Sequence, residues 1–69
     1  MEMIEIIVNG EPLSLPESAT VDTLLERLGH SGKRVAVERN GEIVPRSVHA
    51  EQQIQARDRI EIVHAIGGG

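Results

Sequence analysis

Two Asn-Gly pairs, each placed directly after an apolar run, constrain this chain more than any other feature. Asn9-Gly10 follows the run at 2–8, and Asn40-Gly41 follows the run at 35–39. Asn and Gly tolerate the positive φ angles that two-residue hairpin turns require. The sequence therefore predicts two β-hairpins, separated by about twenty residues in which a helix can form.

The first hairpin shows the alternation of a half-buried strand. Ile4, Ile6 and Val8 fall on one face at a period of two, and Leu13 and Leu15 repeat that pattern after the turn. A proline stands on either side of the second segment, which marks it as a short strand at an edge of the sheet. In the second hairpin, the segment 42–44 is the expected return strand.

One amphipathic helix is predicted between the hairpins. Thr20 has the side chain of an N-cap residue, and Gly29 is suited to follow the last turn. Four apolar residues fall at i, i+3, i+4 and i+7, namely Val21, Leu24, Leu25 and Leu28. We expect this apolar face to pack on the sheet, with Leu25 between the two layers.

The last apolar run, 60–66, predicts a final strand after a polar crossover at 46–59 that holds one short helical turn. If the first and last strands are neighbours at the sheet centre, they must run parallel. The expected fold is α+β: a β-grasp, ubiquitin-like domain in which one main helix covers a mixed sheet of four to five strands. We assign residues 1–66 to this domain and 67–69 to a flexible glycine tail.

Composition excludes several classes of function. The chain has 69 residues, no cysteine, no aromatic residue and a net charge of −4. Disulfides and cysteine-bound iron–sulfur clusters are therefore excluded, and nucleic-acid binding is not expected without a basic stripe or stacking aromatics. No apolar run approaches a membrane span and no signal peptide is recognised, so we expect a cytoplasmic protein that is a monomer when free.

No constellation of residues predicts an enzyme. The three histidines, His30, His49 and His64, lack the spacing of a metal-ligand pair and are interpreted as surface residues. The segment 29–33 contains Gly-Lys, but its spacing is too short for a phosphate loop. Asp22 and Glu26 lie one helical turn apart and are interpreted as part of a solvated helix face.

The glycine run at the end of the sequence is the candidate functional element. Ile66-Gly67-Gly68-Gly69 continues the last apolar run without a polar linker. Glycines allow close approach of another backbone, so such an end can enter a narrow channel and present the Gly69 carboxyl group. We expect Val63, Ala65 and Ile66 beside it to form a surface on which a partner docks. An inert, frayed end is the alternative.

Several motifs resemble the ThiS family of sulfur carriers in thiamine (thiazole) biosynthesis. They occur in the family's order at 8–11, 19–25, 35–41, 43–46 and 58–69. The resemblance implies a β-grasp fold and a Gly69 carboxylate that a ThiF-type enzyme adenylates and that then becomes a thiocarboxylate. It implies that Gly67 and Gly68 enter the partner's active site. It further implies a sulfur-donating protein and thiazole synthase (ThiG) as partners, with ATP used by the activating enzyme and no cofactor bound here.

Other carriers with a similar ending remain alternatives. The small subunit of molybdopterin synthase has a related fold and tail, and a ubiquitin-like modifier forms an isopeptide bond through its terminal glycine. A passive binding domain with an inert tail is a third possibility. Conversion to a thiocarboxylate, as opposed to conjugation to a target protein, distinguishes a carrier from a modifier.

Overall fold

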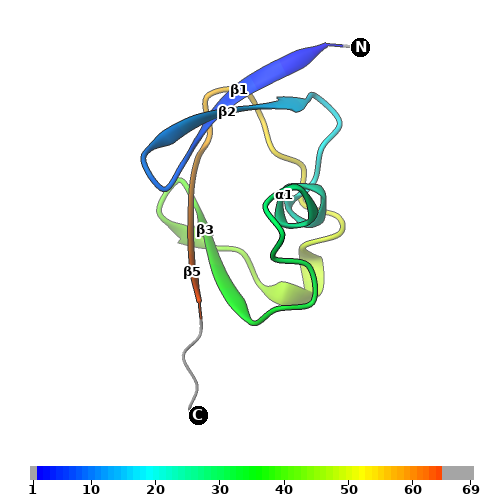
Figure 1. Ribbon diagram of the computed structural model, residues 1–69, viewed down its shortest axis with the longest axis vertical. Coiled ribbons are helices and arrows are strands. Elements are labelled where there is room, and N and C mark those ends of the chain that lie inside the picture. Colours follow the sequence, from blue (N-terminus) through cyan, green and yellow to red (C-terminus); the bar gives the residue numbers. More distant parts are fainter. Residues whose placement is uncertain (1, 65–69) are drawn as a thin grey trace.

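A computed structural model describes residues 2–64 of the chain. It contains five strands, one α-helix and one 3-10 helix, arranged as the alternating apolar runs predicted. Their bounds are β1 (Met3–Val8), β2 (Glu11–Pro16), α1 (Val21–Arg27), β3 (Val35–Arg39), β4 (Glu42–Ile43), η1 (Arg46–Val48) and β5 (Arg59–His64). Figure 1 shows α1 on one side of the sheet.

The strands form one mixed sheet in the order β2-β1-β5-β3-β4. The central strands β1 and β5 pair in parallel, and the other neighbours are antiparallel. The predicted central, parallel pairing of the first and last strands is confirmed. This topology makes β5 a strand with neighbours on both sides, so its position is set by both hairpins.

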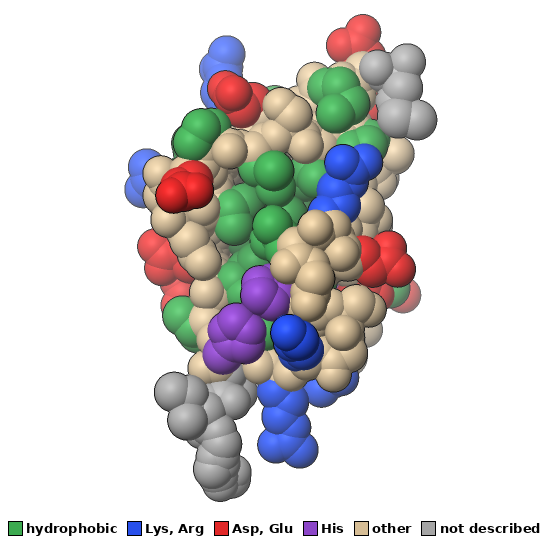
Figure 2. Space-filling model, in the orientation of Figure 1, with side chains coloured by type: hydrophobic (Ala, Val, Ile, Leu, Met, Phe, Trp, Pro, Cys, Tyr) green, Lys and Arg blue, Asp and Glu red, His purple; other side chains and the backbone are tan. Residues whose placement is uncertain are grey.

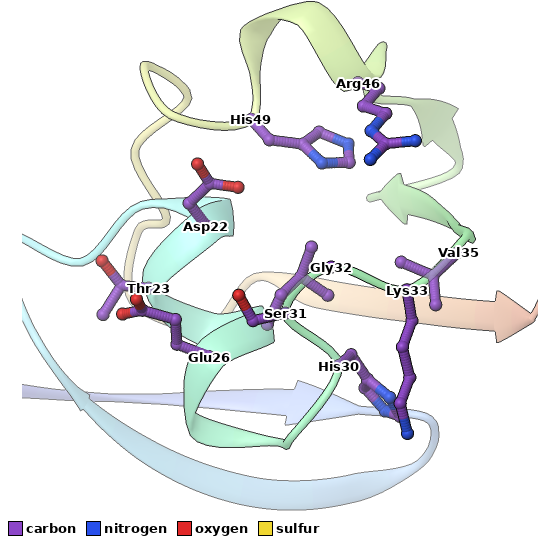
Figure 3. Close-up of a pocket in the computed structure, with 11 residues that line it drawn as sticks. Asp22, Thr23, Glu26, His30, Ser31, Gly32, Lys33, Val35, Arg46 and His49 are labelled. Carbon is purple, nitrogen blue, oxygen red and sulfur yellow. The ribbon is translucent and has the colours of Figure 1, made fainter.

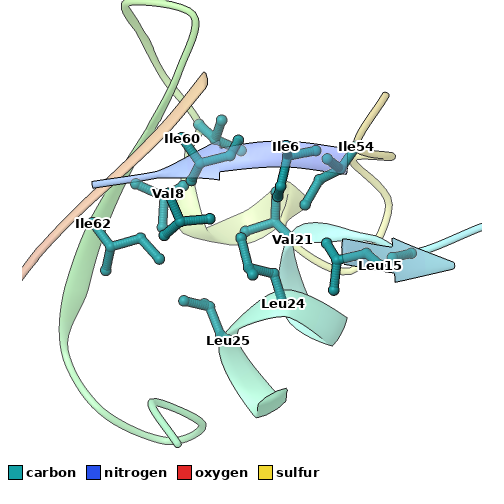
Figure 4. Close-up of a cluster of buried hydrophobic side chains, with 12 residues drawn as sticks. Ile6, Val8, Leu15, Val21, Leu24, Leu25, Ile54, Ile60 and Ile62 are labelled. Atoms are coloured by element: carbon teal, nitrogen blue, oxygen red, sulfur yellow. The ribbon is translucent and has the colours of Figure 1, made fainter. Parts of the chain in front are cut away.

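The core lies between α1 and the sheet (Figure 4). Leu24 and Leu25 of the helix face Ile6 and Ile62 of the central strands, and Leu25 is only 6% exposed, as predicted. The buried apolar residues are Ile6, Val8, Leu15, Ala19, Val21, Leu24, Leu25, Val37, Val44, Ile54, Ile60 and Ile62. An aliphatic core of this kind stabilises a small domain without disulfides or aromatic side chains.

The helix begins and ends where its sequence signals predict. Thr20 caps it, with its Oγ1 accepting a hydrogen bond from the Thr23 amide at 3.2 Å. Asp22 lies in the first turn and Arg27 in the last, which complements the helix dipole. Gly29 follows the helix with φ of +79°, a conformation that glycine adopts without strain.

The crossover at 46–59 supplies partners for the helix N-terminus. The amide of Val21 donates to the Gln52 carbonyl at 3.0 Å, and the amide of Asp22 donates to the His49 carbonyl at 3.1 Å. These two amides have no partner within a helix. The segment therefore fixes α1 as well as connecting β4 to β5, and its one helical turn is η1, as expected.

The second strand differs from the prediction in its length. It spans six residues and includes both flanking prolines, Pro12 and Pro16, which lie opposite Ile7 and Met3. An edge strand tolerates proline because the missing amide hydrogen would face solvent. The prediction that β2 is an edge strand is confirmed, whereas the prediction that it is short is wrong.

Candidate functional site

The last described residues of β5 lead toward the glycine tail. Ile60 and Ile62 point into the core and are at most 6% exposed, whereas Val63 is 60% exposed. The outward orientation of Val63 is therefore as predicted. The other predicted site residues, Ala65, Ile66, Gly67, Gly68 and Gly69, lie outside the described residues, and their roles stay predictions.

Val63 belongs to the sheet face that α1 does not cover, which we call the open face. Strand register places Met3, Glu5, Ile7, Pro12, Ser14, Ala36, Glu38, Ile43, Arg59, Glu61 and Val63 on it. Val63 lies opposite Ala36, and Ile43 of the edge strand β4 is 63% exposed. Ala36 thus lies next to Val63 near the end of β5, whereas Ile43 lies one strand further away, beyond Glu38 of β3. Met3, also exposed, lies at the far end of β1.

The position of β5 is fixed by the side chain of Asn9, which follows β1. The Asn9 Nδ2 donates to the Ile62 carbonyl at 3.2 Å, and the Ile62 amide donates to the Asn9 Oδ1 at 2.8 Å. The Asn9 amide also donates to the Ile60 carbonyl at 2.9 Å. The side-chain amide of Asn9 thus extends the β1–β5 ladder after the main chain has turned away. From its place in the sequence, Asn9 is predicted only as a turn residue.

Asp58 anchors the beginning of the same strand. Its carboxylate accepts hydrogen bonds from the Arg39 Nε at 2.6 Å, the Gln55 amide at 2.8 Å and the Asn40 Nδ2 at 3.1 Å. Burial alone would raise the pKa of Asp58, but these donors and the charge of Arg39 outweigh it and lower the pKa below its ordinary value of 3.8. Asp58 is therefore a buried carboxylate that joins β3 and the second turn to the residues before β5.

Two of the histidines form a contact near the end of β5. The rings of His30 and His64 lie 4.9 Å apart between centroids at an angle of 78°, and the histidine side chains visible in Figure 2 lie together. The Nδ1 atom of His30 is buried without a hydrogen-bond partner. Within residues 2–64, no group of three or more histidines and carboxylates could hold a metal ion.

The interpretation of His49 as a surface residue is wrong. The side chain is 5% exposed, and its Nε2 donates to the Val44 carbonyl at 3.0 Å. That hydrogen bond satisfies one ring nitrogen and allows the imidazole to be buried against Val44. Nothing in the spacing of the histidines could distinguish His49 from the exposed His64.

A groove of about 390 Å³ lies between α1, the loop at 30–33 and η1 (Figure 3). Asp22 and Glu26 of the helix stand on one side of it, and Arg46 and Lys33 stand across from them. Both carboxylates are exposed, which agrees with their interpretation as a solvated helix face. Because acidic and basic side chains both line the groove, its charge does not favour either an anion or a cation.

The part of the chain that the structure describes contains no helix long and apolar enough to cross a membrane.

Comparison with known proteins gives a consistent result. The sequence profile of the ThiS family matches residues 2–69. A crystal structure of the thiamine biosynthesis protein ThiS from Geobacter metallireducens superimposes with a TM-score of 0.82. It is 32% identical, and the match covers 96% of this chain and 100% of that one. The fold class predicted from the sequence, a β-grasp domain, is thereby confirmed.

The similar curated proteins include one of comparable length and others that are several times longer. The sulfur carrier protein ThiS of Bacillus subtilis is 42% identical over 53 residues, which cover 77% of this chain and 80% of that protein. A thiazole synthase of Paramagnetospirillum magneticum is 46% identical over 66 residues, which cover 96% of this chain and 20% of that protein. The chain therefore spans about a fifth of the length of that synthase. With the profile matching nearly every residue and the fold shared with a solved member, this chain belongs to the ThiS family of sulfur carrier proteins in thiamine biosynthesis.

Proposed function

We propose that the carboxyl group of Gly69 carries the sulfur. The observation that supports this most directly is the family match, which continues through the terminal glycines to residue 69. These glycines have no side chain to contribute to a core. Their proposed role is to let the chain end enter an enclosed active site, where a Cβ atom would obstruct the approach.

The proposed activation takes two steps on a ThiF-type adenylyltransferase. The Gly69 carboxylate attacks the α-phosphorus of ATP, pyrophosphate leaves, and an acyl adenylate forms. Hydrosulfide, which a sulfur-donating protein can supply, then attacks the acyl carbon and displaces AMP. With hydrosulfide the products are a thiocarboxylate, AMP and one proton, so atoms and charge balance. ATP is bound by the enzyme, and this chain is its substrate.

We further propose that the thiocarboxylate is delivered to a thiazole synthase. Two relatives with that name, from Paramagnetospirillum magneticum and Magnetococcus marinus, contain a stretch similar to 96% of this chain. A carrier and its acceptor in one polypeptide are held at high effective concentration, and separate proteins must instead recognise each other. The exposed Val63, with Ala65 and Ile66 beyond it, is the proposed contact region next to the tail.

Mass spectrometry tests the carrier function. The protein is incubated with ATP, sulfide and a ThiF-type adenylyltransferase, and the expected product has one terminal oxygen replaced by sulfur. Deletion of Gly69 moves the carboxyl group back by about 3.3–3.6 Å of extended chain and should abolish the product. Gly68→Val should do the same by obstructing the channel.

The matched control adds bulk elsewhere on the surface. Ala50→Val changes an exposed loop residue and should leave sulfur incorporation unchanged. Thermal unfolding of all variants should remain close to that of the unmodified protein, because none of them alters the core. Sulfur incorporation into the Gly69 deletion at the normal rate would show that the tail is inert.

Val63→Asp tests the contact region. The side chain is exposed, so the fold should be retained, but a charge at an apolar contact should raise the KM for adenylation with little change in kcat. An unchanged KM in a folded variant would remove Val63 from the site.

A further inference from the structure

Two glutamates face each other directly across the centre of the open face. The register of the antiparallel pair β3–β5 places Glu38 opposite Glu61. The neighbouring pair in the same register, Val37 and Ile62, is buried in the core. Because side chains alternate along a strand, both glutamates point away from α1, and directly opposed Cβ atoms lie about 4.5–5.5 Å apart.

This arrangement is unfavourable in the free protein. Like charges directly opposite in a sheet destabilise the pairing of the strands. Within residues 2–64 the structure contains one ion pair, Arg39–Asp58, so neither glutamate is neutralised by a salt bridge there. Uncharged residues at both positions would suit the fold better.

The glutamates border a hollow of about 440 Å³ that is lined by both acidic and basic side chains. Arg57 and Arg59 line it together with Glu38 and Glu61. Neither arginine lies within ion-pair distance of either glutamate. Arg59 lies beside Ile7 of β1 and two residues before Glu61 on the same face of β5, whereas Glu38 lies across from Glu61 on β3. The acidic pair therefore lies on the β3 side of the hollow and Arg59 on the β1 side.

Apolar side chains flank the acidic pair. On one side Ile43, 63% exposed, lies opposite Glu38 in the β3–β4 register. On the other side Val63, 60% exposed, follows Glu61 by two residues on the same face of β5. An acidic pair bordered by exposed aliphatic residues is complementary to a partner surface that is apolar and carries a positive charge.

We propose that the activating enzyme docks on the open face and places an arginine guanidinium group between Glu38 and Glu61. This inference rests on the proposed function, because it names how the enzyme recognises the carrier. A guanidinium group can donate to both carboxylates at once and would relieve their repulsion in the complex. The pair therefore lowers the stability of the free carrier and contributes to the affinity and orientation of the complex.

The test separates stability from binding. In the double variant Glu38→Gln, Glu61→Gln, the repulsion is removed and the thermal midpoint rises by a few degrees. In the adenylation assay, the KM for the carrier rises roughly 10- to 100-fold while kcat is unchanged, and the dependence of KM on salt weakens. The probe is the ThiF-type adenylyltransferase of the same organism with ATP, and pyrophosphate release is measured.

A matched control removes the same two charges elsewhere. Glu26→Gln with Glu51→Gln changes exposed residues on α1 and after η1, away from the open face. Its KM should stay within about twofold of the original, since distant surface charges are screened by salt. A rise in KM equal to that of the open-face variant would show a general charge effect and overturn the proposal.

Glu61→Lys provides a second, sharper variant. It places opposite charges across the strands, so the thermal midpoint should rise, yet binding should weaken further than in the glutamine variant. Calorimetric titration of the enzyme without ATP measures this binding directly. A more stable variant that binds the enzyme with unchanged affinity would overturn the proposal.

The same measurements distinguish failure of this inference from failure of the proposed function. If the original protein binds the enzyme but is not adenylated, the carrier function fails, and the affinities of the variants still decide the role of the acidic pair. If the original protein is adenylated and the glutamine variant has the same KM, only the acidic pair is excluded. Absence of binding by the original protein overturns both.

Discussion

The two Asn-Gly turns have nearly identical backbones and different attachments to the rest of the molecule. Asn9 and Gly10 have φ angles of +50° and +87°, and Asn40 and Gly41 have +53° and +86°. Each turn therefore satisfies the same local requirement for left-handed residues. What distinguishes them is the set of groups that each asparagine side chain contacts.

Asn9 bonds to backbone, whereas Asn40 joins a charged network. The Asn9 amide group exchanges two hydrogen bonds with the main chain of Ile62, which is 6% exposed. Asn40 accepts from the amide of the exposed residue Arg59 at 2.9 Å and donates to the buried carboxylate of Asp58. One turn thus holds β5 near its end and the other holds it at its beginning.

This difference shows how two copies of one turn motif can do separate structural work. Both turns anchor β5, the strand that leads to the tail. The Asn9 side chain is uncharged and bonds to the backbone of the buried residue Ile62. The Asn40 side chain donates to the Asp58 carboxylate, which also accepts from Arg39 and Gln55, so Asp58 keeps these two donors when Asn40 is replaced. The variants below are ordered by the size of the expected effect.

Replacing Asp58 by alanine should have the largest effect, because it removes the acceptor on which the second turn depends. Arg39, Asn40 and the Gln55 amide would each lose a partner. Loss of one member of a buried, hydrogen-bonded pair should lower the free energy of unfolding by about 2–3 kcal/mol, a value limited by partial solvation of Arg39. Urea denaturation measures this loss, and Glu51→Ala should change stability by less than about 0.5 kcal/mol.

Replacing each asparagine by glycine removes the side-chain hydrogen bonds but keeps the turn, since glycine adopts these φ angles without strain. The change in the free energy of unfolding then measures the contribution of those hydrogen bonds. Asn9→Gly should cost about 1–2 kcal/mol, because the amide and carbonyl of buried Ile62 lose their partner. Asn40→Gly should cost about 0.5–1 kcal/mol, because Arg59 is exposed and Asp58 keeps other donors. Hydrogen exchange should show faster exchange of the Ile62 amide only in Asn9→Gly. Equal losses in both variants would mean that the attachments do not differ in strength.

Acid should weaken the second attachment and not the first. The donors around Asp58 lower its pKa in the folded state below 3.8, so its contribution to stability is present above that value and is lost as pH falls through the folded-state pKa. Unfolding measured across this acidic range should show a smaller pH slope for Asp58→Asn than for the original protein. Asn9→Gly should retain the original slope, and a reduced slope in that variant would contradict the separation of the two attachments.

Alanine in place of either turn glycine should reveal almost no difference between the turns. A Cβ atom at Gly10 or Gly41 meets nothing within 4 Å, so the cost comes only from the positive φ angle. Each variant should lose about 1 kcal/mol, with a difference below about 0.5 kcal/mol. A larger difference in the urea midpoints would show that the backbones of the two turns are under unequal constraint.

Local sequence signals determined most of the architecture. The Asn-Gly pairs, the apolar alternation and the Thr20 cap act through backbone preferences and neighbouring residues, so each can be recognised within a few positions. The parallel central pair followed from the order of the elements. The identity of the candidate site, the glycine tail with Val63 beside it, was also visible as an apolar run that ends in glycine.

Tertiary structure decided which polar side chains are buried or bonded within the fold and which are exposed. Asn9 bonds to a residue 53 positions away, and Asn40 and Arg39 reach Asp58 across 18 and 19 positions. Such contacts depend on strand register, which no local window contains. The burial of His49 and the opposition of Glu38 to Glu61 arise in the same way, because a one-residue change of register would reverse the face on which a side chain lies.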